Sequence, residues 1–281
     1  MVKTAVIAAA ALGLAGSVGG GSTEMSTAFA ARASAQGTPQ VSSNWAGYAA
    51  VAPTDTGASF DDATATWRQP KATCTSGRTD SAAFWVGLGG YSSDSQALEQ
   101  LGTEVDCRGD GTAPRYSAWW EIVPAAPVTI PLKVAPGDTV AAAVLVQGQT
   151  VTFSMRNLTR KTRFTKRVAV TQALDLTSAE WVAEAPSICS SSNRCRVVPL
   201  TSFGTVTFTK AALTGNGHTG TIADPAWTAT PIELIADSQT SPFFGREDPL
   251  GPGVGAVPGD LGADGRSFGV TWQQSVTPPG P

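Results

Sequence analysis

The chain alternates short apolar runs with turn residues, and none of its long stretches repeats apolar residues with the period of an amphipathic helix. Several runs of strand length end at Pro or Gly, and Asp110-Gly111 and Pro136-Gly137-Asp138 are typical turn sequences. Strands are therefore predicted over residues 41–51, 63–70, 82–88, 97–105, 115–123, 139–146, 150–158, 162–170, 177–186, 197–200, 205–209, 232–235 and 267–272. Many short strands with frequent turns indicate an all-β sandwich or barrel rather than a parallel α/β sheet.

The predicted strand at 177–186 carries an unusual set of polar residues. Successive side chains of a strand point to opposite faces, so Trp181 lies on one face and Glu180, Val182 and Glu184 lie on the other. Carboxylates on a half-buried strand need partners, because burying an unpaired charge is costly. The strand either exposes two surface glutamates or lines a cleft, and the pattern alone leaves both interpretations open.

The first 35 residues are interpreted as a secretory signal peptide. Lys3 precedes an apolar run over residues 4–18, which is too short to span a membrane. Small residues follow, and A-x-A patterns predict cleavage after Ala30 or Ala35. We therefore expect a secreted, extracellular protein that does not associate with a membrane once the signal peptide is removed.

The rest of the chain is predicted to form one domain. Residues 36–40 are interpreted as a short linker or propeptide remnant, residues 41–276 as a single β-sandwich domain, and residues 277–281 as a tail. Within the domain, the Gly/Pro-rich segment 241–265 is predicted to be a long loop, because its prolines exclude a core strand.

Composition narrows the possible functions. Only 15% of the 281 residues are charged and the formal net charge is −3, without the basic patch that nucleic-acid binding requires. A surface poor in charge is less sensitive to pH, which suits an extracellular protein in acidic surroundings. We expect a monomer whose partners are protein or peptide substrates. Asn157-Leu158-Thr159 matches the N-glycosylation sequon, a motif that is common by chance.

The four cysteines are expected to form disulfides, because an exported protein meets an oxidising compartment. Cys189 and Cys195 flank a short polar loop that a local bridge would close, and Cys74 would then pair with Cys107. Four cysteines allow three pairings in all. A zinc site is disfavoured, because the chain has no Cys-x-x-Cys spacing and a single histidine. No metal or other cofactor is expected.

Several catalytic chemistries are excluded by the residues present. His218 is the only histidine, and it sits in a Gly-rich turn rather than beside a nucleophile, which disfavours Ser-His-Asp and Cys-His catalysis. The chain also lacks Gly-x-Ser-x-Gly, His-Glu-x-x-His and a phosphate-binding Gly loop. If the protein is an enzyme, its acid and base are carboxyl groups.

Five short motifs occur in a defined order along the chain. They are Ser43-Asn44-Trp45-Ala46-Gly47, Trp85-Val86-Gly87-Leu88-Gly89-Gly90, Leu98-Glu99-Gln100-Leu101-Gly102, Ala118-Trp119-Trp120-Glu121 and Ala179-Glu180-Trp181-Val182-Ala183-Glu184. Each motif is weak alone, but the five in register resemble the eqolisins, the glutamic peptidase family that includes scytalidoglutamic peptidase. The resemblance covers about residues 43–208, and the leader and the Ala/Gly-rich composition suggest a bacterial-type member.

The resemblance implies both a fold and a site. The implied fold is an antiparallel β-sandwich of two bent sheets, jelly-roll or concanavalin-like, with a groove on the concave face. The implied catalytic dyad is Gln100 and Glu184, and Trp45, Trp85 and Glu121 match positions that surround it.

The chain departs from the family pattern at Gly89, where fungal members usually have an aspartate. An acid at this position is therefore absent or moved, and the spacing suggests Glu104 as a nearby acid. The sequence assigns no role to Glu180 or to His218.

The sequence thus predicts a secreted acid endopeptidase that hydrolyses peptide bonds by direct attack of water. Glu184 would serve as general base and then acid, and Gln100 would orient the water and stabilise the oxyanion. Two alternatives fit a secreted, Trp-rich β-sandwich. One is a jelly-roll glycoside hydrolase that uses Glu121 and Glu184, and the other is a non-catalytic carbohydrate-binding module.

Overall fold

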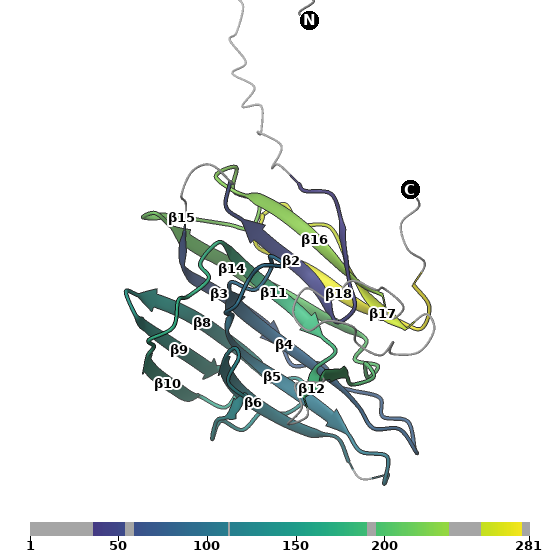
Figure 1. Cartoon of the computed structure of the whole chain (residues 1–281). Coiled ribbons are helices and arrows are strands. Elements are labelled where there is room, and N and C mark those ends of the chain that lie inside the picture. The colour runs from purple at the N-terminus through teal and green to yellow at the C-terminus, as the bar shows by residue number, and fades with distance from the viewer. Residues whose placement is uncertain (1–35, 54–58, 112, 190–194, 236–253, 277–281) are drawn as a thin grey trace, which may run out of the picture. The chain divides into compact units, whose positions relative to one another are not determined.

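The computed structural model describes residues 36–53, 59–111, 113–189, 195–235 and 254–276, and all regular secondary structure in these ranges is β (Figure 1). The predicted signal peptide and the tail lie outside these ranges. The strands are β1 (Gln40–Ser42), β2 (Trp45–Val51), β3 (Phe60–Arg68), β4 (Asp80–Leu88), β5 (Glu99–Cys107), β6 (Arg115–Ile122), β7 (Val128–Thr129), β8 (Thr139–Gln147), β9 (Thr150–Asn157), β10 (Thr162–Ala169), β11 (Ser178–Glu184), β12 (Ser187–Cys189), β13 (Cys195–Val197), β14 (Thr205–Gly215), β15 (His218–Gly220), β16 (Thr228–Ile235), β17 (Gly255–Pro258) and β18 (Phe268–Gln273). Among the described residues, no helix is long and apolar enough to cross a membrane.

Sixteen of the strands form one continuous sheet in the order β10-β9-β8-β3-β14-β18-β17-β16-β2-β11-β4-β5-β6-β7, with β1 beside β16 and β15 beside β14. Every pairing is antiparallel except that of β1 with β16. The sheet curls strongly, so that β3, β8 and β9 cover β11, β4 and β5. The predicted antiparallel β-sandwich is therefore confirmed, with two layers that are continuous with each other.

The core lies between the two layers and is built by alternating side chains. In β8 and β9, every second residue is buried, as expected for strands with one face on the core. Tryptophans span the layers: Trp181 Nε1 of β11 donates to the Thr64 carbonyl of β3, and Trp67 Nε1 of β3 donates to Thr103 Oγ1 of β5. Trp181 thus packs between the layers, on the face opposite Glu184, as predicted.

Strand β4 is buried at every position, because both of its faces are covered. Phe84 and Val86 point into the core, whereas Trp85 belongs to a second apolar cluster on the opposite face, with Trp45 and Trp119. This second cluster forms the base of the face on which the predicted site residues lie.

Two sequence-based boundaries are corrected by the structure. Residues 241–253 of the predicted loop 241–265 lie outside the described residues. The prediction is wrong for residues 255–258, which form strand β17 between β16 and β18. Gly255 is required there, because a Cβ at this position would lie 2.1 Å from the Leu234 carbonyl oxygen. Residues 36–40, interpreted as a short linker or propeptide remnant, pair with the domain: Gln36 bridges Ala229, and Gln40 begins the strand that pairs with β16.

The Cys74–Cys107 disulfide is formed, as predicted, with its Cα atoms 5.4 Å apart. It ties the segment before β4 to the end of β5. The register of β12 and β13 places Cys189 opposite Cys195, but the side chains of both lie outside the described residues, so that bridge stays a prediction.

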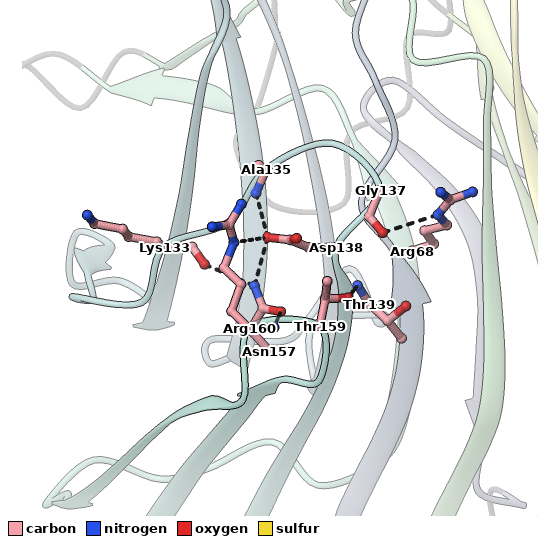
Figure 2. A network of polar contacts seen from close by, with 9 residues as sticks. All are labelled: Arg68, Lys133, Ala135, Gly137, Asp138, Thr139, Asn157, Thr159 and Arg160. Carbon is pink, nitrogen blue, oxygen red and sulfur yellow. Dashed lines mark hydrogen bonds and ion pairs between the residues drawn. The ribbon is translucent and has the colours of Figure 1, made fainter.

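The sequon asparagine is a structural residue (Figure 2). Asn157 is 1% exposed, and its Nδ2 donates to Asp138 Oδ2 at 2.9 Å and to the Lys133 carbonyl at 3.0 Å. Asp138 also accepts from Arg160 Nε and from the Ala135 N–H. Because its amide is buried and engaged, Asn157 cannot carry a glycan without breaking this network.

Candidate active site

Four neighbouring strands, in the order β11-β4-β5-β6, present polar side chains on the face that carries the second apolar cluster. The register aligns Glu184 of β11 with Ala83 of β4, and Ala83 with Glu104 of β5. It also aligns Gln100 of β5 with Glu121 of β6. Residues directly opposite each other in an antiparallel pair share a face, so pairing alone brings these side chains to one side of the sheet.

A cleft of ≈ 580 Å³ lies over this face. Its polar lining includes Gln100, Glu104, Glu121 and Glu184, and its apolar walls include Trp45. The structure therefore brings the two predicted dyad residues into one cleft, from strands that flank β4.

Glu184 is held by two neutral donors. Trp85 Nε1 donates to Glu184 Oε2 at 2.6 Å, and Asn44 Nδ2 donates to Glu184 Oε1 at 3.2 Å. Trp45 contacts the Trp85 ring edge-on, with ring centroids 4.9 Å apart, which fixes the ring that makes the shorter bond. Hydrogen bonds of this kind stabilise negative charge on the carboxylate. Asn44 belongs to the first of the five motifs, but it was not predicted to contact the site.

Gln100 is oriented by Glu121. Its Nε2 donates to Glu121 Oε2 at 2.6 Å, which leaves the second N–H of the amide for a ligand. Gln100 is 5% exposed, and its Oε1 has no hydrogen-bond partner among the described residues. Burial raises the pKa of Glu121 to about 7, although the bond from Gln100 opposes the shift. In acid, Glu121 is therefore neutral.

Gly89, where resemblance led us to expect an aspartate, could not carry a side chain without a shift of the backbone. Its φ is +80°, and a Cβ there would lie 2.3 Å from the Asp175 carbonyl oxygen. The Asp175 carboxylate instead accepts from the Gly90 N–H and from Ser95 Oγ, which fixes the connection between β4 and β5. Burial alone would raise the pKa of Asp175, but these bonds and those from Thr177 hold it below its usual value.

Two more glutamates were not predicted to be buried. Glu180 and Glu99 are 0% exposed, and their carboxyl oxygens form no hydrogen bond of normal geometry with the described residues, although Ser178 lies near Glu180. Glu180 lies on the cleft face, opposite Gly87, but outside the cleft lining. Burial raises the pKa of both groups, that of Glu99 to about 8, and the charge of Asp175 raises both further.

His218 takes no part in the site. It lies on β15, is more than half exposed, and contacts Asp224 at 2.9 Å. The alternative of two surface glutamates on β11 is also wrong for Glu180, which is fully buried.

Comparison with known proteins identifies the family and the fold of the chain. The family model described as the Peptidase A4 family matches residues 43–241. The crystal structure of scytalido-glutamic peptidase with a transition-state analogue inhibitor is 23% identical, with a TM-score of 0.65, and the match covers 82% of this chain and 98% of that one. Aspergilloglutamic peptidase from Aspergillus niger is 25% identical, with a TM-score of 0.52 and coverage of 69% and 99%. No curated protein matches the sequence.

Proposed function

Because the chain belongs to the peptidase A4 family, whose members are hydrolases acting on peptide bonds, we propose that it is a secreted acid endopeptidase with a Gln100–Glu184 dyad. The observation that carries this proposal is that one cleft contains both the Glu184 carboxylate and the Gln100 amide, each held by its own hydrogen bonds. Glu184 is a carboxylate supported by two neutral donors, and Gln100 is a buried amide with an unused N–H.

The groups suit attack of water on a peptide carbonyl. Ionised Glu184 accepts a proton from water as the oxygen attacks the carbonyl carbon, and the carbonyl oxygen becomes an oxyanion. The second N–H of Gln100 donates to that oxyanion. When the tetrahedral intermediate collapses, Glu184 returns its proton to the leaving amine, and both products depart without a covalent bond to the protein.

The other acids of the cleft support an optimum in acid. Burial raises the pKa of Glu121 to about 7 and, with Asp106, that of Glu104 to about 8. Both are neutral at acidic pH, so they do not oppose the negative charge that forms on the substrate. At higher pH, their ionisation adds negative charge to the cleft, and that of Glu121 lies beside Gln100, where the oxyanion forms.

Digestion of an unfolded protein at acidic pH by wild type, Gln100→Ala and Glu184→Gln tests the dyad. We expect each substitution to lower kcat about 10²–10³-fold or more, the usual effect of removing an oxyanion donor or a general base. Gln96→Ala and Glu233→Gln, which change the same residue types outside the cleft lining, should retain activity.

Full proteolysis by either dyad variant would rule out that residue's role. Cleavage of a polysaccharide in the absence of any proteolysis would instead identify the cleft as a glycosidase site.

A further inference from the structure

The hairpin of β9 and β10 concentrates positive charge at one edge of the sheet (Figure 1). Six of the 19 Lys and Arg residues lie in residues 156–167, whereas none of the 22 Asp and Glu residues does. All six are exposed: Arg156, Arg160, Lys161, Arg163, Lys166 and Arg167. The expectation of a chain without a basic patch is therefore wrong for this hairpin, because the net charge of −3 conceals the patch.

The strand register places three of these arginines on the face of the hairpin that is turned away from the core. Phe153 and Met155 of β9 face the core, so the residues between and beside them, and their partners on β10, face outward. Arg163 lies directly opposite Arg156 on this outer face, and Arg167 follows Arg163 by four residues. We call Arg156, Arg163 and Arg167 the outer-face arginines.

Within the described ranges, no ion pair neutralises the outer-face arginines, whereas Arg160 at the turn contacts Asp138 (Figure 2). Like charges directly opposite each other weaken a pair of strands, so Arg156 and Arg163 destabilise the hairpin that carries them. A bound anion would remove this repulsion.

Protection of the sheet edge does not explain all of this charge. Charged side chains on an edge strand block pairing with another sheet, which accounts for the cations of β10. It does not account for Arg156, because β9 is paired on both sides, with β8 and with β10. The side chains around Arg156 on the outer face are small, namely Thr152, Ser154 and Ala141 of β8, and they leave the guanidinium groups accessible.

The chemistry of this surface favours a phosphate polymer over a carboxylate polymer. Arg stays ionised in acid and at neutral pH, and its planar fork matches two phosphate oxygens. Carboxylates lose their charge at about pH 4, whereas phosphodiesters keep theirs. This choice rests on the acidic surroundings of the function proposed above.

Two other partners that carry phosphate fit less well. Positions 150, 152, 154, 156, 163, 165 and 167 form the outer face of the hairpin, and none of them is aromatic, so the bases of single-stranded nucleic acid have no ring on which to stack. Leu158 at the turn is the one exposed large apolar side chain within residues 150–169, which leaves little to insert into a bilayer.

We propose that the outer face of the β9–β10 hairpin binds a linear polymer of phosphodiester-linked polyols. Arg156 and Arg163 hold one phosphodiester between them, and Arg167, about 13 Å along the strand from Arg163, holds another. This face and the cleft belong to different layers and both point away from the core, so a bound polymer leaves the cleft open. The hairpin thereby retains the protein at a surface that carries the polymer.

Binding of end-labelled poly(glycerol phosphate), followed by fluorescence anisotropy at pH 4, tests the proposal. One triple variant replaces the outer-face arginines, Arg156→Gln, Arg163→Gln and Arg167→Gln. The control variant removes the same charge from three exposed arginines elsewhere, Arg115→Gln, Arg196→Gln and Arg266→Gln. Thermal unfolding without polymer checks that both variants are folded, and the outer-face variant should unfold about 1–3 °C above wild type, because it loses the repulsion between two arginines.

Wild type should bind the polymer, and its affinity should fall about tenfold between 50 mM and 200 mM salt, since binding releases counterions. The outer-face variant should bind about tenfold more weakly than wild type, as expected for the loss of three exposed charge contacts. The control variant should stay within about threefold of wild type, because distant charges are screened. Absence of binding by wild type would overturn the proposal, and so would equal weakening in the two variants, since net charge alone would then decide.

Two further probes distinguish the partners. Single-stranded DNA and vesicles of phosphatidylglycerol, each at the same phosphate concentration, should bind no more tightly than poly(glycerol phosphate). Tighter binding of the DNA or of the vesicles would reject the polyol polymer as the partner.

None of these measurements requires catalysis. If peptide digestion fails while polymer binding is weakened only in the outer-face variant, the peptidase function fails and the binding surface stands. If digestion succeeds while wild type does not bind the polymer, the binding surface alone fails.

Discussion

Glu184 and Glu121 line the same cleft, yet their surroundings act on them in opposite ways. Hydrogen bonds stabilise the negative charge of Glu184, whereas burial disfavours the negative charge of Glu121. Glu184 receives hydrogen bonds from Trp85 and Asn44, which stabilise its negative charge. Glu121 receives a bond from Gln100, but burial dominates and raises its pKa to about 7. Two carboxyl groups whose environments differ in this way can take separate roles at one pH. The residue types alone do not distinguish them.

Trp85→Phe tests the support of Glu184. The substitution keeps a ring at this position but removes the Nε1–H that donates to the carboxylate. Because the lost bond favours the ionised form, the acid limb of the kcat/KM profile should move to higher pH by about 1–2 units, the equivalent of one hydrogen bond to a charged group. Thermal unfolding of the variant controls for damage to the apolar cluster. An unmoved acid limb in a folded variant would show that this bond does not support the general base.

Glu121→Gln tests the alkaline limb. Below about pH 7, Glu121 is neutral, whereas above it the ionised carboxylate opposes the oxyanion beside Gln100, so kcat/KM should fall as the pH rises through 7. A glutamine still accepts the bond from Gln100 but never ionises. The alkaline limb should therefore shift toward pH 8, where Glu104 titrates. Superimposable profiles for wild type and variant would contradict this role of Glu121.

At the scale of elements, strand β5 joins fold and site. Leu101 and Val105 point into the core, while Gln100 and Glu104 point into the cleft, so one alternating strand serves both. Far from the cleft, the ends of β8 and β9 depend on the polar network of Figure 2. Burial alone would raise the pKa of Asp138, but bonds from Arg160, Asn157 and the Ala135 N–H hold it below its usual value.

Asn157→Ala should therefore destabilise the fold. It removes three hydrogen bonds from a largely buried site, one of them to the Asp138 carboxylate and one accepted from the Arg160 N–H, so the free energy of unfolding should fall by about 2–3 kcal/mol. Chemical denaturation measures this change. Leu158→Ala, at the next and 40% exposed position, is the matched control and should change stability much less. Equal losses in the two variants would mean that the network contributes nothing specific.

At the scale of the whole molecule, acids from three separate segments are buried near one another. Glu99 comes from β5, Glu180 from β11 and Asp175 from the segment before β11. Asp175 is held ionised by its donors, and its charge raises the pKa of the other two, after the larger effect of burial. Burial favours the neutral, protonated forms of Glu99 and Glu180. The folded state is therefore more stable at acidic pH than at neutral pH.

The pH dependence of stability follows from this arrangement. The pKa of Glu99 rises from 4.5 to about 8 on folding, so its stabilising effect is complete below about pH 4.5 and is lost as the pH rises toward 8. The loss is on the order of 4 kcal/mol from Glu99 alone.

Thermal unfolding between pH 4 and pH 8 measures this effect. The midpoint should fall with rising pH in wild type, and the fall should be smaller in Glu99→Gln, which cannot ionise. Asp94→Asn should follow wild type. A wild-type midpoint that is constant over this range would contradict the prediction.

The sequence by itself determined the all-β class and the order of the motifs. It predicted the Cys74–Cys107 bridge, which the structure confirms, and resemblance implied that Gln100 and Glu184 belong to one site. The all-β class and the motifs depend on local alternation and on short runs of residues, which can be recognised along the chain. The loop prediction failed at β17, because a Gly/Pro-rich run gives no sign that its middle completes a sheet.

Only the tertiary structure decided which partners each acid meets. Asn44 and Trp85 lie 140 and 99 residues before Glu184 in the chain, so no local pattern could connect them. Glu180 and Glu184 lie on the same face of β11. Glu180 is nevertheless fully buried, whereas Glu184 lines the cleft. The difference arises because the burial of each glutamate and the charges near it depend on the strands that pair with β11. The sequence of β11 alone does not specify those neighbours.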